Sequence, residues 1–346
     1  PTTARLPRWL EDEDEDEALA FPAPSLPLPF PSLPLPLPLL WPCAAEYLAQ
    51  SRFTFYNARN FFTGVGKTMS ETHAAKSLNL WPGELPGSCR EDQRDHPMAG
   101  EIPHLVPFLL PGDCTVRPLV VVCPGGGYGC RAGHEGTPIA EWLNGIGMNA
   151  VVCNYRVYPW LHPTPLMDAQ RAVRLVRAHA GEWGVDPSRI GVLGFSAGGH
   201  LACSVANFGD DGEACSDDPV ARYSSRVQAL ISCYAVVSSG PSGHAGSFHN
   251  LLGENPAPEL LQKLSLETTV TPANPPSFIW HTFNDGAVPV ANALLYAQAL
   301  DAAKVPFALH VYPNGHHGLG LAREAPGTAS GWTKECEAWL RELGWL

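Results

Sequence analysis

The sequence of 346 residues predicts an α/β fold, in which a mostly parallel central sheet carries helices on both faces. From residue 79 onward, apolar runs of strand length alternate with segments of helical periodicity, which is the pattern of right-handed strand–helix–strand crossovers. The strand-like runs are continuously apolar, as expected for strands that are covered on both faces. The chain is 45% apolar and 16% charged, so most of it has the composition of a globular protein.

The predicted elements follow one another in a regular order. The first two strands are Leu119–Cys123 (LVVVC) and Asn149–Val157, with a short helix at Pro138–Leu143 between them. A longer helix is predicted over residues 166–183, because apolar residues recur at steps of three and four while arginines lie off that stripe. DPSR then forms a turn before a strand at 190–195 (IGVLGF) and an alanine-rich helix. The remaining predicted elements are strands at Ala229–Tyr234, Ser277–His281 and Phe307–Tyr312 and a helix at Val290–Lys304.

The domain organisation follows from changes in composition along the chain. Residues 1–45 combine an acidic block with Leu-Pro repeats, which predicts a disordered tail with polyproline II character. This tail is either a spacer or a ligand for a proline-recognising partner. Residues 46–78 form a linker or extension of uncertain structure. Residues 79–346 form the predicted α/β domain, within which the polar, glycine-rich segment 238–275 is expected to form a lid.

Charge and cysteine distribution exclude several functional classes. A net charge of −12 repels phosphate backbones and anionic lipid, so we expect neither nucleic acid nor membrane as a partner. No run of about 18 apolar residues free of proline occurs, and no export signal is visible. The sequence has no CxxC pair or Cys/His ligand spacing, and several cysteines lie in apolar runs. We therefore expect no metal, no cofactor and a reducing, cytoplasmic location.

Ser196 is the candidate nucleophile. It follows the strand IGVLGF directly, precedes the alanine-rich helix and lies in the pattern G-x-S-x-G (GFSAG). Glycines at these two positions allow a sharp strand-to-helix turn that exposes the serine hydroxyl at the carboxyl end of the sheet. The pattern alone recurs by chance in glycine-rich chains, but the strand before it and the helix after it favour the nucleophile over a merely tight turn.

A serine nucleophile needs a histidine base and a carboxylate that orients the histidine. Asp285 lies in the loop after the predicted strand Ser277–His281, and His316 and His317 lie in the loop after the last predicted strand. The chain order serine, aspartate, histidine matches the order of the α/β-hydrolases. The residues alone do not decide between the two adjacent histidines.

The glycine loop CPGGGYG after the first strand is the second half of a predicted oxyanion hole. Glycines let the backbone N–H groups approach a substrate without a side-chain clash, so we assign Gly126 and Gly127 as donors. The third donor is the backbone N–H of Ala197, the residue after the nucleophile. A phosphate cradle is the other interpretation of such a loop, but no Lys-Ser/Thr pair follows it.

Several blocks in order carry a family resemblance. PGGGY, HEG, NYRVYP, the segment HPTPLMDAQRAVRLVRAHAGEWGVDPSRIGVLGFSAGGHLA, PPSFIWHTFNDGAVPV and YPNGHHGLGLA together resemble the acetyl-xylan-esterase and feruloyl-esterase-like (BD-FAE) branch of the α/β-hydrolases. The resemblance covers about residues 79–346 and implies a metal-free serine esterase that acts on acyl groups attached to carbohydrate. It also implies that His317, directly before Gly-Leu-Gly, is the base. The substrate expected on this basis is a small-molecule or oligosaccharide ester.

Four further residues are predicted to line the rim of the substrate pocket, because they lie in loops at the carboxyl ends of the predicted strands: Tyr128, His134, Glu135 and Trp160. Two alternative functions remain open at this point. One is a serine peptidase that uses the same three residues, and the other is a catalytically silent module of the same fold that binds a partner.

Overall fold

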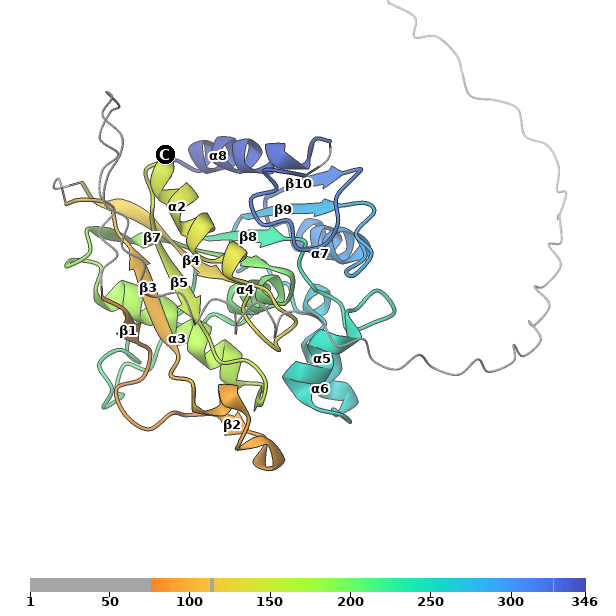
Figure 1. Ribbon diagram of the computed structural model, residues 1–346. Coiled ribbons are helices and arrows are strands. Elements are labelled where there is room, and N and C mark those ends of the chain that lie inside the picture. Colours follow the sequence, from red (N-terminus) through yellow and green to blue (C-terminus); the bar gives the residue numbers. More distant parts are fainter. Residues whose placement is uncertain (1–75, 113–114, 326) are drawn as a thin grey trace, which may run out of the picture. The chain divides into compact units, whose positions relative to one another are not determined.

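The structure, a computed structural model, describes residues 76–112, 115–325 and 327–346 (Figure 1). The predicted tail over residues 1–45 and the part of the predicted linker up to residue 75 lie outside the described residues. The sheet begins with strand β1 at Leu78, one residue before the predicted start of the domain.

Eight strands form one sheet in the order β1-β3-β5-β4-β7-β8-β9-β10. At one edge, β3 runs antiparallel to both of its neighbours, β1 and β5. The other six strands of the sheet, β5, β4, β7, β8, β9 and β10, are parallel to one another, as the sequence predicts. The strands are β1 (Leu78–Asn79), β3 (His104–Phe108), β4 (Arg117–Cys123), β5 (Asn149–Asn154), β7 (Val185–Phe195), β8 (Ala229–Cys233), β9 (Ser277–Thr282) and β10 (Phe307–Tyr312). A separate pair joins β2 (Ser88–Cys89) to β6 (Trp160–Leu161).

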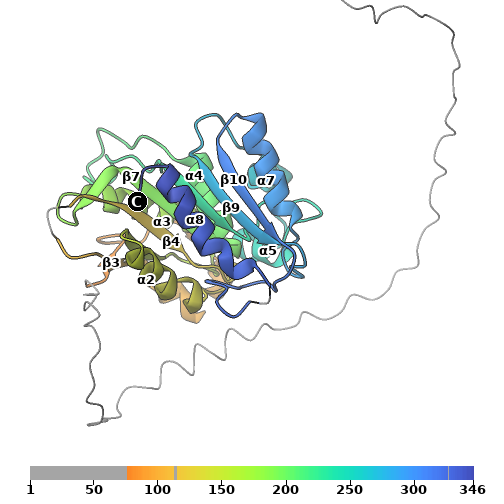
Figure 2. The same ribbon diagram turned by 90° about the horizontal axis from the view of Figure 1, so that it is seen from above.

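Helices cover both faces of the sheet (Figures 1 and 2). Along β4, Val121 and Cys123 belong to one apolar core and Val120 and Val122 to the other, because successive side chains of a strand point to opposite faces. Helices α3 (Thr164–Ala178), α4 (Ser196–Phe208) and α7 (Ala291–Ala302) contribute to the first core, and α2 (Thr137–Gly145) and α8 (Trp332–Glu342) to the second.

The boundary between α3 and β7 differs from the prediction. The helix ends at Ala178 instead of residue 183, although the apolar stripe continues. Residues 179–184 form turns, in which the rings of His179 and Trp183 stack (centroids 5.0 Å apart). The DPSR segment, predicted as a turn, lies inside β7, which begins at Val185 and pairs there with Arg117. The C-terminal helix α8 and the antiparallel edge strands were not predicted.

The segment 238–275 contains two helices, α5 (Ala245–Leu252) and α6 (Pro258–Lys263). Helix α5 is hydrogen-bonded to the glycine loop, because Asn250 Nδ2 donates to the carbonyl oxygen of Gly127 at 2.9 Å. The backbone N–H of His162 donates to Leu251 at 2.8 Å from the other side. The insertion is therefore attached next to the loop that follows β4. Within the described ranges, no helix combines the length and apolar character needed to cross a membrane.

The short 3₁₀ helices complete the described elements. They are η1 (Glu91–Gln93), η2 (Pro97–Gly100), η3 (Gly133–Glu135), η4 (Leu266–Thr268) and η5 (Ala329–Gly331).

Candidate active site

Ser196 occupies the sharp turn between β7 and α4. Its φ angle is 53°, a left-handed conformation that is strained for a residue with a side chain. Close backbone approach explains the flanking glycines, since a Cβ on Gly194 would lie 2.0 Å from the carbonyl oxygen of Gly198. A Cβ on Gly198 would lie 2.2 Å from the carbonyl oxygen of Cys123, at the end of β4. The G-x-S-x-G pattern is therefore needed sterically at this turn.

His317 lies between Ser196 and Asp285. The distance from His317 Nε2 to Ser196 Oγ is 2.7 Å, and the distance from His317 Nδ1 to Asp285 Oδ2 is also 2.7 Å. Because the carboxylate can only accept, Nδ1 carries the proton and Nε2 is left to accept from the serine hydroxyl. His316 is turned away, with Nδ1 at 2.7 Å from the carbonyl oxygen of its neighbour. The structure thus brings together three predicted residues and leaves His316 outside.

The surroundings of Asp285 favour its charged form. Burial would raise the pKa of this carboxyl, but hydrogen bonds from His281 and His317 and from the backbone N–H of Val288 outweigh burial and hold the pKa of Asp285 well below its usual range. Oδ1 accepts from the backbone N–H groups of Ala287 and Val288, both at 2.9 Å. His281 Nε2 lies 3.4 Å from Oδ2. The carboxylate is therefore fixed and ionised at neutral pH.

The glycine loop after β4 lies against the Ser196 turn. A Cβ on Gly125 would lie 2.7 Å from the carbonyl oxygen of Phe195 and 3.0 Å from Ser196 Cβ, so the two backbones are in contact. Gly126 and Gly127 have φ angles of 127° and 62°. No acceptor among the described residues takes the backbone N–H of these two glycines or of Ala197, the residue after the serine. These donors are available to a ligand beside the serine hydroxyl.

Two of the four predicted rim residues are not at the rim. Tyr128 and Glu135 are buried, each with 2% of its surface exposed. The Tyr128 hydroxyl lies 2.9 Å from His200 Nδ1 in the core, and the Glu135 carboxylate is bonded on both oxygens by other parts of the protein. The sequence interpretation fails here because a polar loop residue was taken to be exposed, whereas its partners come from distant segments.

The other two predicted rim residues are more accessible. His134 is exposed, with Nε2 at 3.0 Å from the carbonyl oxygen of Gly318, so it contacts the loop that carries His317. Trp160 is half-buried in β6, where the Arg156 guanidinium lies over its ring at 4.6 Å from the centroid.

Sequence reasoning missed two residues that interact with His317, one by ring contact and one electrostatically. The ring of Tyr234 meets the imidazole of His317 edge-on, with centroids 5.1 Å apart. His244 caps α5, where its Nδ1 accepts from the backbone N–H of Ser247 at 3.2 Å. Burial, and next the electrostatic effect of His317, lower the pKa of His244. Tyr234 ends an apolar run and His244 lies in a glycine-rich segment, so neither carried a signal of its own in the sequence.

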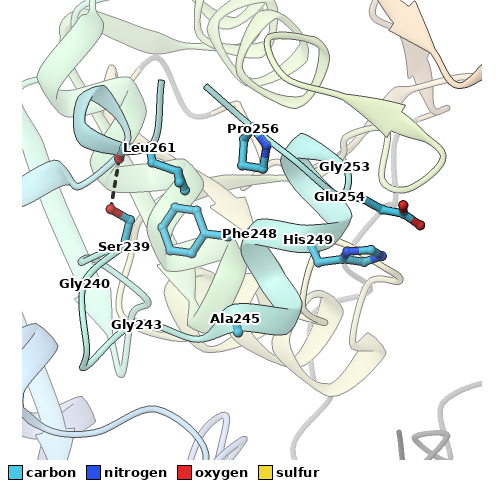
Figure 3. A pocket seen from close by; sticks show the side chains of 10 residues that line it. All are labelled: Ser239, Gly240, Gly243, Ala245, Phe248, His249, Gly253, Glu254, Pro256 and Leu261. Atoms are coloured by element: carbon cyan, nitrogen blue, oxygen red, sulfur yellow. Dashed lines mark hydrogen bonds between the residues drawn. The ribbon is translucent and has the colours of Figure 1, made fainter. Parts of the chain in front are cut away.

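The insertion also holds a cavity of about 260 Å³, lined by residues between Ser239 and Leu261 (Figure 3). Phe248 of α5 and Leu261 of α6 line it together, and Ser239 Oγ donates to the carbonyl oxygen of Leu261 at 3.0 Å. Ser196, Asp285 and His317 do not line this cavity. The role of the insertion as a lid stays a prediction.

Comparisons with known proteins agree with this geometry. The BD-FAE family model matches residues 109–300. The chain is 40% identical over 239 residues to endo-1,4-beta-xylanase B of Butyrivibrio fibrisolvens, covering 68% of this chain and 37% of that protein. It is 33% identical over 245 residues to an acetylxylan esterase of Xylanibacter ruminicola, covering 69% of this chain and 47% of that protein. The chain thus spans less than half the length of these two relatives.

A solved structure is similar over its whole length. The acetyl ester-xyloside bifunctional hydrolase from Caldicellulosiruptor lactoaceticus is 45% identical, with a TM-score of 0.75, and the match covers 80% of this chain and 100% of that chain. The family match spans more than half of the present sequence, and it includes the glycine loop, the Ser196 turn and Asp285. The predicted resemblance is confirmed: this chain has the α/β-hydrolase fold and belongs to the BD-FAE family.

Proposed function

We propose that this protein is a serine esterase that hydrolyses carboxylic esters, with acyl groups of the acetyl or feruloyl type on carbohydrate as its substrate class. The observation that carries the proposal is the continuous hydrogen-bonded line from Asp285 through His317 to Ser196, with both distances at 2.7 Å. The substrate class is suggested by two relatives, an acetylxylan esterase and an acetyl ester-xyloside bifunctional hydrolase.

The first half of the reaction forms an acyl-enzyme. His317 Nε2 takes the proton of the Ser196 hydroxyl while Oγ attacks the ester carbonyl carbon. The ionised Asp285 holds the proton on Nδ1 and stabilises the imidazolium that forms. The negative charge that develops on the carbonyl oxygen is taken up by the N–H groups of Gly126, Gly127 and Ala197. When the tetrahedral intermediate collapses, the bond from the acyl carbon to the sugar oxygen breaks, and the imidazolium gives its proton to that oxygen, which leaves as the sugar hydroxyl.

The second half releases the acid. A water molecule takes the place of the alcohol, gives a proton to His317 Nε2 and attacks the acyl carbon through the same oxyanion site. Collapse of the second intermediate breaks the bond to Oγ, and His317 returns the proton to Ser196. The carboxylic acid leaves and the starting state is restored.

The test is turnover of an ester panel by the purified chain, with Ser196→Ala as the matched variant. We expect release of acetate from acetylated xylo-oligosaccharides and from p-nitrophenyl acetate, and a loss of about 10⁴-fold or more in the variant. A fluorophosphonate should add one phosphonyl group to the wild type, seen by intact mass, and none to the variant. Hydrolysis of peptidyl anilides in preference to esters would favour a peptidase, and absence of both labelling and turnover would favour a silent module.

A further inference from the structure

A buried carboxylate lies between the two loops that carry the proposed chemistry. Glu135, at the end of η3, has both carboxylate oxygens occupied. Its Oε2 accepts from the backbone N–H of Gly125 at 2.8 Å, one residue before the proposed oxyanion donors. Its Oε1 accepts from the hydroxyl of Tyr234 at 2.6 Å. A Cβ on Gly125 would lie only 2.6 Å from Oε2, so the carboxylate is packed directly against the glycine loop.

Tyr234 extends this connection to the histidine loop. Its hydroxyl oxygen accepts from the backbone N–H of Gly320 at 2.8 Å, three residues after His317. Burial, and next the Glu135 carboxylate, raise the pKa of Tyr234 well above its usual value, so the hydroxyl keeps the proton that it donates. The same ring meets the imidazole of His317 edge-on. Tyr234 therefore contacts the histidine loop through both its hydroxyl and its ring.

The connection is reinforced by the residue next to Glu135. His134 Nε2 lies 3.0 Å from the carbonyl oxygen of Gly318, which can only accept, so His134 donates to the residue directly after His317. Helix η3 is thus joined to the histidine loop directly through His134 and indirectly, by way of the Tyr234 hydroxyl, through Glu135. The chain of hydrogen bonds from Gly125 to Gly320 joins segments that are far apart in sequence, since Glu135 and Tyr234 are 99 residues apart.

A purely structural role explains this arrangement poorly. Burying a carboxylate is costly, and an apolar pair of similar volume would fill the same space without that cost. An apolar pair would not fix the orientation of its neighbours. Each oxygen of Glu135 accepts one hydrogen bond, one from the glycine loop and one from Tyr234, which in turn is bonded to the histidine loop. A fully bonded polar network fixes one geometry more narrowly than apolar packing does.

We propose that Glu135 and Tyr234 are positioning residues that set the distance between the oxyanion donors and the imidazole of His317. This inference rests on the proposed esterase function. Proton transfer at Ser196 and charge uptake at Gly126 and Gly127 must occur around one reacting carbon, so an error of about 1 Å between the loops costs about 100-fold in rate. Neither residue touches the substrate in this role, so binding of a small ester is unaffected.

The test uses two conservative variants and their combination. Tyr234→Phe keeps the ring against His317 but removes the hydroxyl that joins Glu135 to Gly320. Glu135→Gln replaces one accepting oxygen by a donor, so only one of the two donors can still be satisfied. Each should lower kcat for p-nitrophenyl acetate about 10- to 100-fold with KM within about threefold. Because both break the same chain, the double variant should be no slower than the slower single variant.

A matched control separates positioning from general loss of stability. Tyr296 is also fully buried, and its hydroxyl donates to Asn207 Oδ1 at 2.7 Å near the carboxyl end of α4. Asn207 is eleven residues beyond Ser196, about 16 Å along the helix. Tyr296→Phe should lower the melting temperature as much as Tyr234→Phe does and leave kcat unchanged. Equal kcat values for these two variants, or additive losses in the double variant, would overturn the proposal.

A substrate-free measurement keeps this inference distinguishable from the proposed function. Hydrogen exchange at the amide of Gly320 should accelerate at least tenfold in Tyr234→Phe, which removes its acceptor oxygen. In Glu135→Gln, exchange at the amide of Gly125 or of Gly320 should accelerate at least tenfold, because only one of the two donors to the side chain is still satisfied. If the variants exchange in this way but the wild-type protein turns over no ester, the function proposal fails while the link between the loops stands. If the variants leave both amides as protected as in the wild type, the link itself is refuted, whatever the activity.

Discussion

Replacing Gly198 by alanine should separate the nucleophile turn from the glycine loop. The added Cβ would lie 2.2 Å from the carbonyl oxygen of Cys123 and 2.3 Å from that of Pro124, about 1 Å short of an ordinary contact at 3.4 Å. Both oxygens belong to the backbone where β4 leads into the oxyanion loop, so no side chain can rotate to relieve the clash. The start of α4 and the end of β4 must move apart.

The expected cost of Gly198→Ala follows from that displacement. Overpacking of this kind lowers the free energy of unfolding by about 1–3 kcal/mol. A shift of about 1 Å between Ser196 and the oxyanion donors lowers kcat about 100-fold.

The assays are urea unfolding and turnover of p-nitrophenyl acetate. Gly145→Ala is the control, because Gly145 also lies in a helix and a Cβ there meets nothing within 4 Å. The control should be as stable as the wild type or slightly more so. Wild-type kcat in Gly198→Ala would show that the two backbones are not in contact and refute the steric explanation.

Three further results are expected. Asp285→Asn should keep the two backbone hydrogen bonds to Oδ1 but place an amide against His317 Nδ1, so kcat should fall about 10⁴-fold with little change in melting temperature; a loss below tenfold would rule out the tautomer role. His317→Ala should cost several orders of magnitude in kcat and His316→Ala at most about tenfold, and the reverse ranking would exchange their roles. Burial lowers the pKa of His200 from 6.5 to about 4. Between pH 6.5 and pH 4, this imidazole is therefore protonated in the unfolded chain and neutral in the folded chain. The free energy of unfolding should therefore fall by about 3 kcal/mol as the pH drops from 6.5 to 4, and less steeply in His200→Gln; parallel pH profiles of the two proteins would contradict this.

The sequence sufficed to place Ser196, Asp285 and His317 near one another. Each follows a predicted strand, and the carboxyl ends of parallel strands meet at one edge of a sheet. The antiparallel edge was missed because β1 has only two residues and β3 (HLVPF) is short and contains a proline. Local patterns of this length do not distinguish an edge strand from a loop.

The burial of Glu135 could not be predicted from the sequence. A charged residue in a polar glycine loop is usually exposed, so its expected place was the rim of the pocket. Its burial depends on two donors, Gly125 and the hydroxyl of Tyr234, of which the second is 99 residues away. No local period or motif connects such residues, because a hydrogen bond between distant segments exists only after the sheet has brought them together.

Because the residues of the site are far apart in the sequence, ester turnover reports whether the whole domain has folded. Ser196 and His317 are 121 residues apart, and Tyr234 and Gly320 are 86 apart, so the site does not form in any intermediate that lacks the long-range strand order. Long-range pairings of this kind form slowly, after local helices. During refolding, recovery of helical circular dichroism should therefore precede recovery of activity. A chain truncated before β10 should show no turnover, because it lacks His317 as well as the last strand and α8.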